Sequence, residues 1–148
     1  MSLLLTSCTS RVYTPEIRSE FTAEAEYSFS GFKYKTKITV TPDTVIVELL
    51  TTAARGLIIK NDGKNITYAQ GSMRKSFPVE KIDVTNPSRV IYDVFNDVVS
   101  LTPEIAGEQF VFKGECSAGR YILRLDRTGY AESLSLPQSD ITINFLSY

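Results

Sequence analysis

Apolar and polar residues alternate regularly along the chain from residue 21 onward. In the first such segment the apolar positions are Phe21, Ala23, Ala25, Tyr27 and Phe29. A period of two over this length predicts a half-buried β-strand. The alternation resumes after Ser30-Gly31, a pair typical of a turn, and continues over residues 32–40. The two segments therefore predict a long antiparallel hairpin.

Shorter alternating or apolar segments follow this hairpin. They predict strands over residues 44–50, 57–60, 65–70, 72–77, 109–116, 119–126, 130–136 and from 141 onward. Residues 44–50 are apolar on both sides, which predicts a strand in the interior of the sheet. Asp62-Gly63 lies between two apolar segments and predicts a tight hairpin turn. The whole pattern predicts about nine or ten strands.

One segment changes to a helical period. Asn86 and Pro87 are residue types typical of an N-cap and a first helical position. Apolar residues then recur at helical spacing, at Val90, Ile91, Val94, Phe95, Val98 and Leu101. Because Pro103 limits the segment, the pattern predicts one amphipathic helix over residues 87–101.

These elements predict a mainly β (α+β) fold. A large antiparallel sheet tends to curl rather than stay flat, and its apolar concave face must then be covered. The single helix is available as that cover. We therefore expect a curled antiparallel sheet, or incomplete β-barrel, with one amphipathic lid helix. The length of 148 residues fits one domain, which we place at residues 20–148.

Charged residues alternate with the apolar ones in the first hairpin. Glu24 and Glu26 on one strand face Lys33, Lys35 and Lys37 on the next. Cross-strand pairs of opposite charge are typical of a solvated sheet face, although a functional basic patch is the alternative. The chain has 16 basic and 17 acidic residues, with no clustered basic surface of the kind that binds nucleic acid.

The sequence offers little for catalysis or metal binding. Histidine is absent, which removes the usual general base and metal ligand. Asp93 and Asp97 are spaced as i, i+4, which we interpret as a solvated helix face rather than an acid–base pair. We interpret Cys116 as a small, buried and inert strand residue. We therefore expect no catalytic residues, no metal, no cofactor and no enzymatic activity.

The N-terminal residues Leu5-Thr6-Ser7-Cys8 resemble the lipobox of bacterial lipoproteins. The resemblance implies cleavage before Cys8, a diacylglycerol on its thiol and a place on the outer face of the cell membrane. Residues 1–7 would be a signal-peptide remnant, and residues 8–19 the lipidated cysteine with its tether. A complete signal has a longer apolar core of about 7–15 residues, so we expect either that the true start lies upstream of Met1 or that the sequence has been trimmed. The alternative is an N-terminal tail with a chance cysteine.

Four local patterns resemble the LolA/LolB-like superfamily, the Lol family of lipoprotein carriers and receptors. They are the hairpin over 21–40, the Asn61-Asp62-Gly63-Lys64 hairpin with Ile66-Thr67-Tyr68, the helix from Pro87, and the closing segments 121–126, 134–137 and 140–145. The resemblance implies an incomplete β-barrel whose helices cover a cavity that accepts acyl chains, without catalysis. This chain has one predicted helix where the family has more.

We therefore expect a membrane-anchored lipoprotein of the cell envelope that binds a lipid or another hydrophobic ligand between the sheet and the lid. The expected ligand contacts are Phe21, Tyr27, Phe29, Phe32, Tyr34, Val94, Phe95 and Val98. Apolar cavities with few polar groups are typical of such sites, but the same side chains could pack on each other as core. The alternative function is a surface-tethered interaction or sensor module. It would contact an envelope protein through charged residues, namely Lys33, Lys35, Lys37, Arg120 and Arg124.

Overall fold

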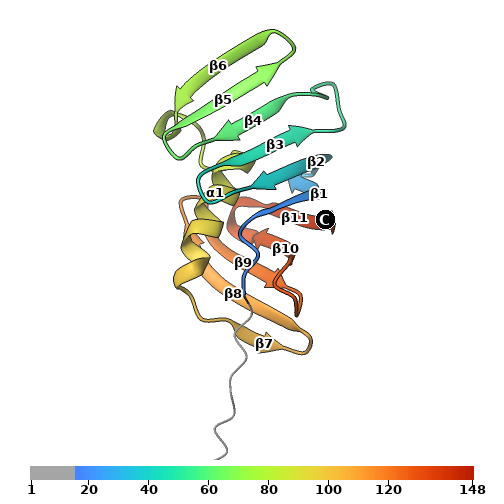
Figure 1. Cartoon of the computed structure of the whole chain (residues 1–148), viewed down its shortest axis with the longest axis vertical. Helices are drawn as coiled ribbons and strands as arrows, with labels where there is room; N and C mark the ends of the chain where they lie inside the picture. The colour runs from blue at the N-terminus through green and yellow to red at the C-terminus, as the bar shows by residue number, and fades with distance from the viewer. Residues whose placement is uncertain (1–15) are drawn as a thin grey trace, which may run out of the picture.

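The computed structural model describes residues 16–148, which form one open antiparallel sheet of eleven strands and one α-helix (Figure 1). The strand order is β6-β5-β4-β3-β2-β1-β11-β10-β9-β8-β7, so β6 and β7 are the two edges. The strands are β1 (Phe21–Phe29), β2 (Phe32–Val40), β3 (Val45–Leu49), β4 (Ile58–Asn61), β5 (Asn65–Gln70), β6 (Met73–Pro78), β7 (Glu104–Ala106), β8 (Gln109–Cys116), β9 (Gly119–Leu125), β10 (Ala131–Leu136) and β11 (Ile141–Ser147).

The sequence pattern located most of these elements. The mainly β class, the open sheet with a single helix, and the interior position of β3 are confirmed. The prediction missed β7, a strand of three residues that are all exposed. Three residues are too few for a period-two alternation to mark the strand.

The helix α1 (Pro87–Asp97) begins where the sequence predicts. The Asn86 side-chain oxygen accepts a hydrogen bond of 3.0 Å from the Ser88 backbone N–H, and Pro87 occupies the first turn. The helical segment continues as the 3₁₀ turn η2 (Val98–Ser100), so it ends one residue before the predicted Leu101. Two further 3₁₀ turns also have three residues each: η1 (Val79–Lys81) lies between β6 and α1, and η3 (Pro137–Ser139) connects β10 to β11.

The helix occupies the inside of the curled sheet. It packs on β3 and β4 of one half of the sheet and on β8 of the other half. Val90, Ile91 and Val94 are fully buried there, within one core cluster that includes inward-facing residues of both halves. Figure 1 shows α1 lying across the middle of the sheet, with β5 and β6 extending beyond it. The apolar face of the helix therefore covers the centre of the sheet's inner face.

The outer face of the first hairpin is charged, as predicted. Glu24 pairs in register with Lys37, and Glu26 with Lys35. Lys33 Nζ lies 4.0 Å from Glu26 Oε1, and the lysine is well exposed. Exposed ion pairs of this kind contribute little to stability, about 0–1 kcal/mol. The lysines therefore lie on a solvated sheet face.

The residues before β1 are held against the domain. The Arg18 N–H donates to the Gly129 carbonyl at 3.0 Å, and its guanidinium lies over the Tyr130 ring. Gly129 has a φ of +91°, and a Cβ there would overlap the carbonyl oxygen of Glu16. Residues 16–18 thus pass along the β9–β10 turn, which determines where the preceding chain leaves the domain. The predicted lipidation site, Cys8, lies outside the described residues.

We expect Asn86→Ala to lower the free energy of unfolding by about 1–2 kcal/mol, because it removes both the N-cap and a bond to β5. Asn86 Nδ2 also donates to the Tyr68 hydroxyl at 2.8 Å. Asn86→Asp is the matched variant, since it retains the capping oxygen and loses only the amide donor. Urea denaturation should rank the wild type above Asn86→Asp, and Asn86→Asp above Asn86→Ala. Equal stability of the two variants would mean that the cap contributes nothing.

Candidate functional site

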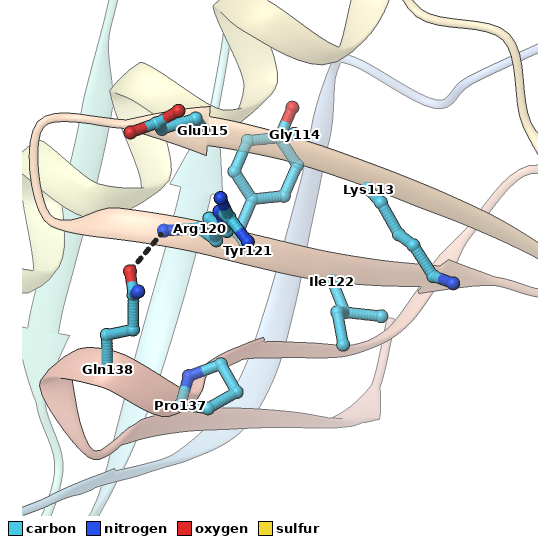
Figure 2. A pocket seen from close by; sticks show the side chains of 8 residues that line it. All are labelled: Lys113, Gly114, Glu115, Arg120, Tyr121, Ile122, Pro137 and Gln138. Carbon is cyan, nitrogen blue, oxygen red and sulfur yellow. Dashed lines mark hydrogen bonds between the residues drawn. The ribbon is translucent and has the colours of Figure 1, made fainter.

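A groove of about 590 Å³ lies on the outer side of the β8–β9 hairpin, beside η3 (Figure 2). Its volume is within the range of about 300–1,000 Å³ that is usual for small-molecule sites. Its lining residues come from β8, β9 and η3; they are Lys113, Gly114, Glu115, Arg120, Tyr121, Ile122, Pro137 and Gln138.

The strand register explains which side chains reach this groove. Lys113 pairs with Ile122 and Glu115 with Arg120, so these four share the outer face of the hairpin. The intervening pair, Gly114 and Tyr121, belongs to the opposite face. Pairing thus brings two bases, one acid and one apolar side chain together on one surface.

The η3 turn forms the other wall of the groove. Pro137 starts this turn, and Asp140 ends it in the left-handed conformation at a φ of +52°. Gln138 Oε1 accepts a hydrogen bond of 3.2 Å from the Arg120 backbone N–H, shown as the dashed line in Figure 2. This contact holds η3 beside the start of β9.

The groove combines an apolar surface with cationic groups. Ile122 and Pro137 are apolar, and the alkyl stems of Lys113 and Arg120 extend that surface. Lys113 Nζ lies 3.4 Å from Glu104 Oε2, and both side chains are exposed. Within residues 16–148, the Arg120 guanidinium has no ion pair within 4.0 Å. Arg120 can therefore bind the anionic group of a ligand whose apolar part lies along Ile122.

Tyr121 connects the groove to the helix. Its ring is buried and directed toward α1, away from Pro137 and Gln138 (Figure 2). Its hydroxyl donates to Asp97 Oδ2 at 2.5 Å. Burial, together with this bond to a carboxylate, raises the pKa of Tyr121 above its usual value. A Cβ at Gly114 would overlap the Tyr121 hydroxyl, so only glycine fits opposite this contact.

The prediction that Asp93 and Asp97 lie on a solvated helix face is wrong. Both are partly buried, and both face the β8–β9 hairpin. Asp97 accepts the Tyr121 bond, and Asp93 interacts with Ser117 in the hairpin turn. Asp93 Oδ2 is buried and has no hydrogen-bond partner. Burial raises the pKa of Asp93, and the positive charge of the nearby Arg89 acts in the opposite direction. Sequence spacing shows which residues share a helix side but does not show what packs against that side.

Cys116 ends β8 next to these carboxyl groups. Its side chain is partly buried, and burial is the main reason that its pKa is raised. A raised pKa lowers the thiolate fraction at neutral pH, which makes the thiol a poor nucleophile. This supports the interpretation of Cys116 as an inert strand residue.

The eight predicted ligand contacts lie in three places. Tyr27, Val94 and Val98 are fully buried in the core cluster, where Tyr34 packs its ring 5.2 Å from that of Tyr27. Phe21 and Phe95 pack together near the C-terminal end of α1, with ring centroids 5.4 Å apart. Phe29 and Phe32 flank the β1–β2 turn, and Phe32 is 74 % exposed. The core positions thus make the contacts of an ordinary apolar interior.

A cleft at the margin of the lid includes one of the predicted contacts. It lies between the C-terminal half of α1 and the β2–β3 turn, with a volume of about 190 Å³. Phe95 lines it, together with Val99, which is 65 % exposed. The volume is below the usual range of about 300–1,000 Å³ for small-molecule sites.

Sequence reasoning named Arg120 as a surface charge but missed Ile122, Pro137 and Gln138 as its neighbours. The sequence signal for these neighbours was Pro137. It starts a turn between two predicted strands that both come after Arg120 along the chain. In the described part of the chain, no group of three or more His, Cys, Asp or Glu side chains is arranged to hold a metal ion. No helix within residues 16–148 is long and apolar enough to span a membrane.

We predict that the stability difference between Asp93→Asn and the wild type changes with pH. Folding raises the Asp93 pKa, so the charged carboxylate destabilises the folded wild type above that pKa. The penalty vanishes below the usual value of 3.8, where both states are protonated. As pH rises from 3.8 to the raised pKa of Asp93, the free energy of unfolding of Asp93→Asn should therefore increase relative to that of the wild type. Urea denaturation across the pH range measures this, and a pH-independent difference would contradict it.

Comparisons with known proteins add no family to this geometry. No protein-family model matches the chain, and no curated protein matches it either.

Proposed function

We propose that this protein binds an amphiphilic ligand, an apolar chain with an anionic group, in the groove between the β8–β9 hairpin and η3. The observation that carries the proposal is the coexistence of an apolar groove of about 590 Å³ and an arginine without an ion pair at its wall. The anionic group would bind Arg120, and the chain would lie against Ile122 and Pro137. Guanidinium–carboxylate hydrogen bonds are charge-assisted and strong, which favours an acid over a neutral lipid.

The expectation of a hydrophobic ligand is thereby kept, but its site is moved to the outside of the sheet. The volumes support this choice, because the groove has about 590 Å³ and the cleft beside Phe95 about 190 Å³. The under-lid site is the second candidate. It is favoured by one observation, the exposed Val99 at the margin of that cleft.

We further propose that the protein is tethered to the outer face of a bacterial cell membrane through a lipid on Cys8. The proposal rests on the lipobox-like order of residues 5–8. Residues 16–18 lie along the β9–β10 turn, so the chain before β1 meets the domain at the opposite end of β9 from Arg120 and the groove.

We expect decanoate to bind the groove and Arg120→Gln to weaken that binding about tenfold, since a hydrogen bond to a charged group contributes about 1.5–3 kcal/mol. Decanol, which lacks the charge, should lose little affinity in the same variant. Titrations followed by ¹H–¹⁵N NMR measure both affinities and locate the shifted resonances. Arg124→Gln is the matched control, because Arg124 lies on the same strand but does not line the groove.

The same titrations separate the two candidate sites. Val99→Trp would fill the margin of the lid cleft, and its exposed position should leave folding unchanged. Groove binding predicts that Val99→Trp has wild-type decanoate affinity and that shifts concentrate at residues 113–122 and 137–138. If decanoate instead shifts resonances around Phe95, and Val99→Trp abolishes those shifts, then the ligand binds in the lid cleft. Absence of binding to either probe would refute the amphiphile proposal.

The anchor is tested separately in the organism of origin. We expect the mature protein in its membrane fraction to begin at Cys8 and to carry the mass of a diacylglyceryl group, with Cys8→Ser released from the membranes. Intact-protein mass spectrometry of both forms makes the measurement. An unmodified Cys8 would refute the anchor without affecting the groove.

A further inference from the structure

Within residues 16–148, the sheet has one long edge that no other strand covers. The edge strand β6 pairs with β5, its only partner strand in the described residues. Five of its six residues are exposed. The opposite edge strand, β7, has only three residues. An edge strand presents a row of backbone donors and acceptors that another extended chain can pair with, so β6 offers the longer template.

The exposed residues of β6 include large apolar side chains. Met73 is 69 % exposed and Phe77 is 39 % exposed. They alternate with Arg74 and Ser76, so the two sides of the strand differ in chemistry. Charged residues often protect an edge from pairing, but here the basic Arg74 and Lys75 stand beside exposed apolar groups.

A hollow lies on each side of this edge. The hollow on the inner side, of about 200 Å³, is lined by the apolar and aromatic groups of Leu57, Tyr68, Met73 and Phe77 and by the polar side chains of Gln70, Arg74 and Lys75. The Tyr68 and Phe77 rings are 6.1 Å apart in an edge-to-face arrangement. Figure 1 shows β5 and β6 extending beyond α1, so the helix does not cover this side.

The hollow on the outer side is larger and carries cations. Its volume is about 380 Å³, and its lining includes Ile58, Lys60 and Arg74. Asp62 also lines it, but its carboxylate accepts the N–H groups of Lys64 and Asn65 in the β4–β5 turn. These bonds hold the pKa of Asp62 below its usual value. The one acid in this hollow is therefore engaged with its own turn.

The strands β4 to β6 are basic in an otherwise slightly acidic chain. Residues 58–78 contain the bases Lys60, Lys64, Arg74 and Lys75 and the single acid Asp62, whereas the whole chain has a net charge of −1. Charge complementarity therefore favours an acidic partner at this edge.

We propose that β6 accepts an extended, acidic segment of a partner protein as an additional antiparallel strand. Because side chains alternate across a strand, apolar residues of the segment would enter the inner hollow, and its Asp or Glu residues would meet Lys60 and Arg74 in the outer one. Backbone pairing along β6 supplies affinity, and the two hollows supply specificity. The surface is separate from the Arg120 groove, which lies on β8 and β9.

The test uses the peptide acetyl-Val-Glu-Phe-Glu-Val-Glu-Val-amide and the full chain. We expect saturable binding by ¹H–¹⁵N NMR, with slowed hydrogen exchange of β6 amides at residues 73–77. The double variant Arg74→Glu/Lys75→Glu should weaken binding at least tenfold. Lys35→Glu is the matched control, because it reverses an exposed charge on β2 and should leave affinity unchanged.

Two further peptides separate strand addition from simple charge attraction. A peptide methylated on every backbone nitrogen has no N–H donors, cannot pair along β6 and should not bind. A peptide with Lys in place of Glu should also fail. Equal binding of the methylated peptide, or equal weakening by Lys35→Glu, would overturn the proposal. So would binding to phosphatidylglycerol vesicles without peptide binding, or self-association of the chain through β6 in place of the peptide.

Discussion

The structure depends on the burial of one helix face inside an open sheet. A closed barrel would bury its inner face against itself, but this sheet leaves β6 and β7 as unpaired edges. The fully buried residues Val90, Ile91 and Val94 provide the apolar surface on which both halves of the sheet pack. Each such side chain contributes about 1.5–3 kcal/mol when buried. Without α1 the inner face of an eleven-stranded sheet would be exposed to water, and the two halves would have no common core.

Polar contacts fix the helix at both ends. At its start, Asn86 caps the first turn and binds Tyr68, while Asn61 Nδ2 donates to the Ser88 carbonyl at 3.3 Å. At its end, Asp97 accepts the Tyr121 hydroxyl. The first set holds the helix to β4 and β5, and the second holds it to β9. Directional bonds of this kind determine the position of a helix that hydrophobic burial alone would allow to slide.

The filled interior determines where ligands and partners can bind. Since Tyr27, Val94 and Val98 are packed in the core, hollows on the described residues lie at the margin of the lid, on the outer face of β8–β9, along β6 and beside the β7–β8 turn. Tyr121 links one of these places to the interior, because its backbone lies in the wall of the groove and its hydroxyl lies on the helix. A change in the helix position would therefore alter the groove through this residue.

The sequence by itself determined most of the strands, the helix and its cap, and the inward side of strands such as β1 and β9. These follow from local periodicity and from residue types such as Asn86 and Pro87, which act over a few positions. Strand β7 was not predictable, because three exposed residues are too few to show a period of two. Tertiary structure alone decided that Tyr27 and Val98 pack as core, that Asp93 faces a hairpin rather than solvent, and that Pro137 and Gln138 meet Arg120. Such contacts join residues far apart along the chain, and their geometry depends on sheet curvature and helix placement, which no local pattern encodes.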